Sequence, residues 1–156
     1  MSRDAELELY RGFRAVQDRY VYFLLAAAGA SIAFSVTQTQ DDVIGAAHLP
    51  LAVAVVLWGL SFYLGCRRVT TIGSSLYANS NLLKVEGGRH PEVGNHPEMQ
   101  LIASQGIRKA IETISAKAHL FGVWQFRTLI AGAVFFIIWH TLEMYMRVPQ
   151  VAVTPG

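Results

Sequence analysis

The sequence predicts an all-α membrane protein: three transmembrane helices with cytoplasmic helical extensions that form a small helical bundle. Two observations support this fold class. Hydrophobic residues make up 53% of the 156 residues and charged residues only 15%. The few charges are also unevenly spread, because the blocks 20–40, 43–66 and 128–142 contain none. A bilayer core about 30 Å thick needs roughly 20 apolar residues of helix, so these blocks are typical of membrane spans.

The charge-free blocks divide the chain into seven predicted segments. They are a cytoplasmic amphipathic helix at 1–19, a first span at 20–40, a short outer loop at 41–48, a second span at 49–66, a cytoplasmic helical hairpin at 67–126, a third span at 127–146 and an outer tail at 147–156. The second span either begins near Val43 and kinks at Pro50, or begins at Pro50 after His48, and we prefer the later start. A cleaved signal peptide is the alternative for the first block. It is disfavoured because four acids and four arginines precede the block, whereas a signal peptide begins with a short basic segment.

The basic residues predict the orientation of the spans. Twelve of the 13 lie before the first span, between the second and third, or, in the case of Arg127, at the inner end of the third, and only Arg147 follows the third. Asp41 and Asp42 lie in the first loop. The positive-inside rule therefore predicts a cytoplasmic N-terminus and an outer C-terminus, in a bacterial inner membrane. Aromatic residues at the predicted boundaries agree: Tyr20, Tyr22, Tyr63 and Trp124 on the inner side, Trp139 and Tyr145 on the outer side.

The predicted cytoplasmic hairpin carries one apolar stripe on each of its helices. In the first helix the stripe is Val69, Ile72, Leu76 and Leu83. Asn79 stands at the position where the repeat would have another apolar residue. In the second helix it is Met99, Ile102, Gly106, Ile107, Ala110, Ile111, Ile114, Ala118 and Phe121. A Gly- and Pro-rich segment at 86–97 separates the helices, and its two His-Pro-Glu copies, at His90 and His96, each resemble a helix start. Without a proline until Pro149, the last helix can run unbroken for ~50 residues, or ~75 Å.

The stripes leave two arrangements open. The three cytoplasmic arms close on each other within one chain, or they pair between chains. We prefer homo-oligomerisation because the last stripe is long and the arms are thin.

The first candidate site lies near the predicted outer face. His140 and Glu143 are three residues apart, so they share one face of a helix, and His48 is expected at the same depth, together with Asp41 and Asp42. Such a set suits a divalent metal or proton transfer, and two histidines suit haem. The structural alternative is that His48 caps a helix, His140 bonds a neighbouring helix and Glu143 pairs with Arg147. No cofactor is favoured by the sequence.

Two further sets of residues have a predicted role. Ser31, Ser35 and Gln38 form a narrow polar stripe on the first span, which lines a pore if several subunits face an axis and otherwise serves as a packing seam. Arg67, Arg68 and Arg127 flank the spans and are expected to contact anionic lipid headgroups. Nucleic acid is not an expected partner, because the basic loop lacks interleaved aromatic residues.

These features predict a protein that works by assembly. No phosphate-binding loop, nucleophile elbow or zinc-protease motif is present in the sequence, so an enzyme acting alone is disfavoured. We expect a homo-oligomeric scaffold or small channel. The alternative is an accessory subunit of a larger membrane redox or transport complex, in which His48, His140 and Glu143 provide a cofactor or proton site.

Overall fold

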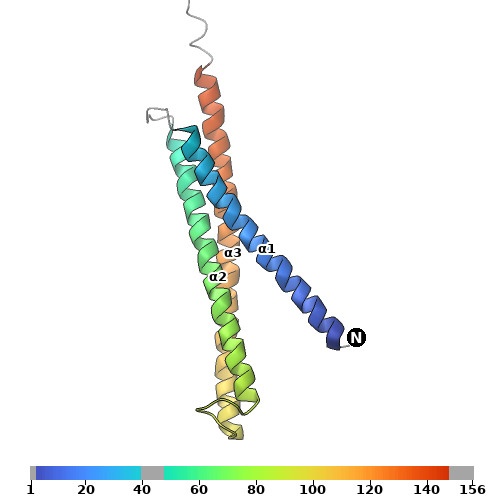
Figure 1. Ribbon diagram of the computed structural model, residues 1–156. Coiled ribbons are helices and arrows are strands. Elements are labelled where there is room, and N and C mark those ends of the chain that lie inside the picture. The colour runs from blue at the N-terminus through green and yellow to red at the C-terminus, as the bar shows by residue number, and fades with distance from the viewer. Residues whose placement is uncertain (1–2, 40–47, 148–156) are drawn as a thin grey trace, which may run out of the picture. The chain divides into compact units, whose positions relative to one another are not determined.

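Three long helices make up the fold (Figure 1). The computed structural model describes residues 3–39 and 48–147. Within these residues the chain forms α1 (Arg3–Gln38), α2 (Leu49–Glu86) and α3 (Pro97–Arg147), and no strand. Each helix is long and apolar enough to cross a membrane. The predicted all-α class with three spanning helices and a small helical bundle is therefore confirmed.

The ends of the helices follow from local sequence. Helix α2 begins at Leu49, beside Pro50, which is tolerated there because the first helical N–H groups have no partner in the helix. It ends at Glu86, after which Gly88 has a φ of +66°, and the backbone N–H of Arg89 bonds to the carbonyl of Lys84 at 2.8 Å. This is a Schellman motif, in which glycine takes the left-handed conformation at little cost.

The two His-Pro-Glu copies differ in structure. Pro97, in the second copy, opens α3, and the N–H of Gln100 bonds to the carbonyl of His96 at 3.0 Å. The first copy lies in the turn between α2 and α3, where the N–H of Gly94 bonds to the carbonyl of His90 at 3.0 Å. The prediction that both copies start a helix was therefore right for the second and wrong for the first. Helix α3 then continues for 51 residues without a break, as predicted.

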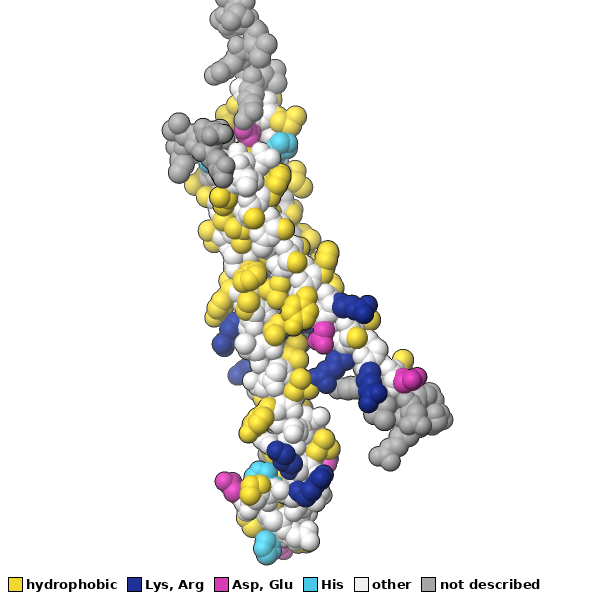
Figure 2. Space-filling view, in the orientation of Figure 1, with side chains coloured by type: hydrophobic (Ala, Val, Ile, Leu, Met, Phe, Trp, Pro, Cys, Tyr) yellow, Lys and Arg dark blue, Asp and Glu magenta, His cyan; other side chains and the backbone are white. Residues whose placement is uncertain are grey.

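The chain forms two compact units. We call Met1–Tyr63 with Trp124–Gly156 the three-helix unit, and Leu64–Val123 the hairpin unit. Hydrophobic side chains dominate the surface where the three helices lie together, whereas Lys and Arg side chains lie along the first half of α1 and over the hairpin unit (Figure 2).

Buried side chains of the three-helix unit recur at steps of three or four residues, or at seven and eleven, which are sums of such steps. They are Val21, Leu24, Ala28 and Ser35 on α1; Leu51, Ala54, Trp58 and Ser61 on α2; Gln125, Thr128 and Trp139 on α3. Such spacing places the buried side chains on one face of each helix. Many positions in the pattern are small, which lets the helix backbones approach closely.

A close approach joins α2 to α3 at Trp58. Its side chain is 4% exposed, and its indole Nε1 donates a hydrogen bond to the carbonyl of Leu129 at 3.2 Å. A Cβ atom added at Gly132 would lie 2.6 Å from that Nε1 and 3.1 Å from the carbonyl oxygen of Ala54. Only glycine at position 132 therefore leaves room for the indole.

An aromatic cluster extends this contact to α1. The ring of Phe136 lies 5.7 Å from that of Trp58, 6.0 Å from Phe34 and 5.4 Å from Trp139, measured between centroids. Offset and edge-on ring pairs at such separations are favourable. Phe136 thus connects aromatic rings of all three helices.

The predicted boundary aromatics are divided between two environments. Tyr20, Tyr22, Tyr63, Trp124 and Tyr145 are exposed, as boundary anchors must be. Trp139, which the sequence places with them, is instead only 3% exposed. Its ring packs in the aromatic cluster, so its role as an anchor was predicted wrongly.

Within the hairpin unit, most of the predicted stripe of α2 does not pack against α3. Leu82 and Val85 are buried and Ile72 is half-buried, whereas Val69, Leu76 and Leu83 are exposed. The inner face also carries the small residues Ser75 and Ala78, both half-buried. The stripe is therefore not the face that α2 packs within the chain, because close helix packing selects small residues as readily as large apolar ones, and its pairing between chains stays a prediction.

On α3 the predicted stripe is divided between two faces. Ile107, Ile111, Ile114 and Phe121 are half-buried and Ala118 is buried, so they form the packed face with Ser104. Met99, Ile102, Gly106 and Ala110 are exposed.

Near the turn, Glu86 and Arg108 form a salt bridge of 2.6 Å between exposed side chains, which adds little stability.

We predict that Gly132→Ala weakens the three-helix unit. The added methyl group overlaps the indole of Trp58, and overpacking of this kind costs about 1–3 kcal/mol. Gly59→Ala is the matched control, because a Cβ there meets nothing within 4 Å. The measurement is the free energy of unfolding in mixed micelles titrated with a denaturing detergent. Equal values for the two variants would show that Trp58 does not need the space at Gly132.

Candidate functional site

The predicted His48, His140 and Glu143 set is divided between two pockets. His140 is exposed and Glu143 half-buried, and both line a small pocket of ≈ 130 Å³ with Gln38. His48 lies just before α2 and lines a larger pocket between α1 and α2. The ring of Trp139 neighbours both histidines, at 6.3 Å from His48 and 6.2 Å from His140.

The ring stacking of His140 is the best-defined feature of the small pocket. Its imidazole lies parallel to the ring of Phe136, with an interplanar angle of 2° and a centroid separation of 6.3 Å. Among the residues that the structure describes, no three His, Cys, Asp or Glu side chains gather closely enough to hold a metal ion. Asp41 and Asp42, which the sequence places at the same depth, lie outside those residues. A metal, haem or proton role for this set stays a prediction.

The polar stripe of α1 contacts two different environments. Ser35 is buried, and its hydroxyl donates to the carbonyl of Ser31 at 2.9 Å. Ser31 is half-buried. Gln38 is exposed and reaches the small pocket beside His140 and Glu143. The structure therefore does not bring the three side chains to one surface, and whether the stripe lines a pore or packs stays a prediction.

The three predicted lipid-contacting arginines differ in exposure. Arg67 and Arg127 are exposed, and the guanidinium of Arg127 lies 5.7 Å from the ring centre of Trp124, within cation–π range. Arg68, in the hairpin unit, is half-buried. Its guanidinium lies against Gly122, where an added Cβ would be 2.9 Å from its Cζ. The Nε of Arg68 is buried and has no hydrogen-bond partner.

A buried polar band, made of Ser61, Gln125 and Thr128, is the feature that the sequence analysis missed. The hydroxyl of Ser61 donates to the main-chain carbonyl of Gln125 at 2.8 Å, and the hydroxyl of Thr128 donates to the carbonyls of Trp124 and Gln125, at 2.8 and 3.1 Å. The Ser61 bond joins α2 to α3, whereas the two bonds of Thr128 lie within α3. The predicted stripe of α3 ends at Phe121, and one further step of four residues reaches Gln125.

Gln125 itself is the most unusual residue of the band. It is fully buried, and neither the oxygen nor the nitrogen of its side-chain amide has a hydrogen-bond partner. An unpartnered buried amide costs about 1–3 kcal/mol. Buried polar groups of this kind fix the register of helix packing in some bundles. The band is therefore suited to setting how α2 and α3 align.

We predict that Gln125→Leu raises the free energy of unfolding by about 1 kcal/mol, because it removes two unpartnered polar atoms and keeps a similar volume. Gln105→Leu, at an exposed position of the same helix, is the control and is expected to change stability by less than about 0.5 kcal/mol. The same detergent titration measures both. A loss of stability in Gln125→Leu would show that the amide has a partner in the membrane.

Comparisons with known proteins assign no family to this chain. The sequence matches no protein-family model and no curated protein, and no solved structure matches the chain. The function has to be argued from the residues of the chain itself.

Proposed function

We propose that this integral membrane protein is a scaffold that assembles with further copies of itself through the hairpin unit. The three apolar helices fit a membrane protein. The distribution of basic residues supports an orientation in which the N-terminus and the hairpin unit are cytoplasmic and the C-terminus is outside. Under this orientation the hairpin unit lies in water.

The observation that carries the proposal is an exposed apolar row on α2, made of Val69, Leu76 and Leu83. Their side chains are 37%, 43% and 59% exposed. The residues are seven apart, so they lie on one face of the helix, with the spacing of a coiled-coil seam. A contiguous apolar surface of a protein in water marks an interaction site when it is large enough.

Burial of this row in the lipid bilayer is disfavoured because of the charged residues around it. Residues 67–127 carry eight basic and four acidic side chains, among them Lys84, Arg108 and Lys109. Moving such groups into a bilayer core costs roughly 2.5–3.5 kcal/mol each. The exposed faces of α3 in the hairpin unit carry further apolar residues, namely Met99, Leu101, Ile102 and Leu120. A second copy presents the same row and offers an apolar partner of matching period.

Scaffold is favoured over channel by the position of Ser35. A pore-lining hydroxyl has to face a shared axis, whereas Ser35 is 1% exposed and bonds to its own helix. The exposed Leu9 and Val16 of α1 provide a second apolar row with a seven-residue spacing. Together these features support pairing between chains and argue against a water-filled pore.

An accessory-subunit role is the second candidate, and the pocket shared by Gln38, His140 and Glu143 favours it. An imidazole, a carboxylate and an amide around a hollow of ≈ 130 Å³ suit a small polar ligand or a proton. In this role the chain depends on a different membrane subunit rather than on its own copies.

We predict that the double variant Leu76→Glu/Leu83→Glu separates the copies. Two charges on the row oppose apolar pairing, so the subunit count by native mass spectrometry from lipid nanodiscs falls to one. The control is Thr70→Glu/Ser74→Glu, which adds the same charges at exposed positions about 120–160° around the helix from Leu76, at 100° per residue. It is expected to keep the wild-type count.

Two results would contradict the scaffold. One is a wild-type protein that is already a monodisperse monomer, and the other is a Leu76→Glu/Leu83→Glu variant with an unchanged count. A monomer that carries metal mass, lost in His140→Ala, would replace the scaffold with the accessory-subunit role.

A further inference from the structure

We propose that Arg68, held against Gly122, binds the phosphate group of an anionic phospholipid at the membrane boundary. Both residues belong to the hairpin unit, Arg68 on α2 and Gly122 on α3. A Cβ atom added at Gly122 would lie 2.9 Å from Cζ, 2.9 Å from Nη1 and 3.1 Å from Nε of Arg68. The guanidinium therefore occupies the space that a side chain at position 122 would fill, and the glycine sets where the charge lies.

The charge of Arg68 has no counter-ion in the part of the chain that the structure describes. Its Nε is buried without a hydrogen-bond partner. The two terminal nitrogens are not buried, and they form no hydrogen bond or ion pair with a described residue. A cation that is partly withdrawn from water is costly unless an anion pairs with it. The accessible nitrogens therefore offer a site for an anion from outside the chain.

The sequence around Arg68 excludes an acid of the hairpin unit as that anion. Residues 64–85 and 113–123 contain four Lys or Arg residues but no Asp or Glu. On α3 the nearest preceding acid is Glu112, ten residues or ~15 Å before Gly122. Its carboxylate is too far along the helix to reach a guanidinium that contacts Gly122.

The place of Arg68 in the chain favours a phospholipid as the source of the anion. Arg68 is the second residue after the charge-free block 43–66, so it lies at a membrane boundary in either orientation. Trp124, two residues after Gly122, is exposed, as an interfacial anchor has to be. Phospholipid phosphates lie at this depth, and a guanidinium binds phosphate through two parallel N–H···O bonds. The inference needs only a membrane-embedded chain, so it does not depend on assembly of copies.

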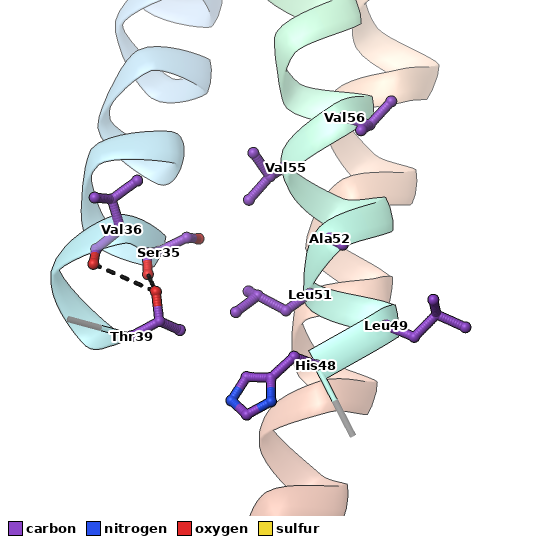
Figure 3. Close-up of a pocket in the computed structure, with 9 residues that line it drawn as sticks. All are labelled: Ser35, Val36, Thr39, His48, Leu49, Leu51, Ala52, Val55 and Val56. Atoms are coloured by element: carbon purple, nitrogen blue, oxygen red, sulfur yellow. Dashed lines mark hydrogen bonds between the residues drawn. The ribbon is translucent and has the colours of Figure 1, made fainter. Parts of the chain in front are cut away.

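The pocket between α1 and α2, by contrast, has no Lys or Arg side chain in its described lining (Figure 3). The hydroxyl of Ser35 donates to the carbonyl of Ser31 at 2.9 Å, and that of Thr39 to the carbonyl of Ser35 at 3.1 Å. Both hydroxyls are thus satisfied within α1. An anionic headgroup is therefore better matched by Arg68 than by this pocket.

The test is native mass spectrometry of the full chain in a neutral detergent, with phosphatidylglycerol and phosphatidylcholine of the same acyl chains added in equal amounts. We expect the wild type to retain one phosphatidylglycerol per chain in preference to phosphatidylcholine. Arg68→Gln is expected to lower the retained fraction about tenfold or more, because hydrogen bonds to a charged group are lost. Arg67→Gln removes the same charge at the exposed neighbouring position, and is expected to lower it by no more than about fivefold.

Gly122→Ala tests the position of the charge without removing it. The added Cβ displaces the guanidinium, which is the far end of a flexible side chain. The fold is therefore expected to tolerate the change, while the retained phosphatidylglycerol falls about tenfold. Gly106→Ala is the matched control on the same helix, because a Cβ there meets nothing within 4 Å, and it is expected to retain the wild-type amount.

Equal retention of the two lipids by the wild type would overturn the proposal, and this readout does not depend on the folding of any variant. Equal losses in Arg67→Gln and Arg68→Gln would also overturn it, because they would show a general effect of charge, as would unchanged retention in Gly122→Ala. A parallel sample contains excess inorganic phosphate. A lipid that stays bound there supports the phospholipid, whereas its replacement by phosphate mass would overturn the lipid as the source of the phosphate group.

Discussion

The packing of Trp58 against Gly132 is the contact on which the rest of the three-helix unit depends. It brings two long helices close enough for the indole to donate to a main-chain carbonyl of the neighbouring helix. In a lipid environment apolar burial does not drive helices together, so close van der Waals packing and interhelical hydrogen bonds have to do so. Once α2 and α3 are fixed in this way, Phe136 has a defined position from which to contact Phe34 of α1.

The polar band next to this contact is suited to setting the alignment of α2 with α3. The hydroxyl of Ser61 has one acceptor, the carbonyl of Gln125, and that bond is made in only one alignment of the helices. The unpartnered amide of Gln125 opposes stability, whereas the Ser61 bond favours the observed register because it is lost when the helices slip. The core therefore combines a steric contact at Gly132 with a polar one at Ser61.

Sequence alone predicts the helices of this protein well and their faces less well. Charge-free blocks, Pro97 and the Gly-rich turn identify where helices run and end, because these signals are local. The face that packs is a relation between helices. Val69, Leu76 and Leu83 are apolar yet exposed, whereas Ser75 and Ala78 lie on the inner face with Leu82 and Val85, since small residues allow a closer approach.

The candidate site shows the same limit. The three-residue spacing of His140 and Glu143 places them on one face of α3, and the structure has them in one pocket. His48 lies just before α2 rather than on α3, and its separate pocket could not be predicted from depth alone. Gln125 was missed because a single polar residue in an apolar segment does not show which way it faces.

The central claim is that the hairpin unit lies in the cytoplasm, where its exposed apolar row needs a protein partner. The most direct measurement is the accessibility of a single cysteine in that unit: Cys66→Ser removes the native thiol, and Ser80→Cys adds one at an exposed position of α2. A membrane-impermeant maleimide is then applied to intact cells and to inverted membrane vesicles. The account predicts labelling only in the inverted vesicles. Labelling of intact cells would reverse the orientation, and no labelling from either side would place the row in lipid, so either result would contradict the account.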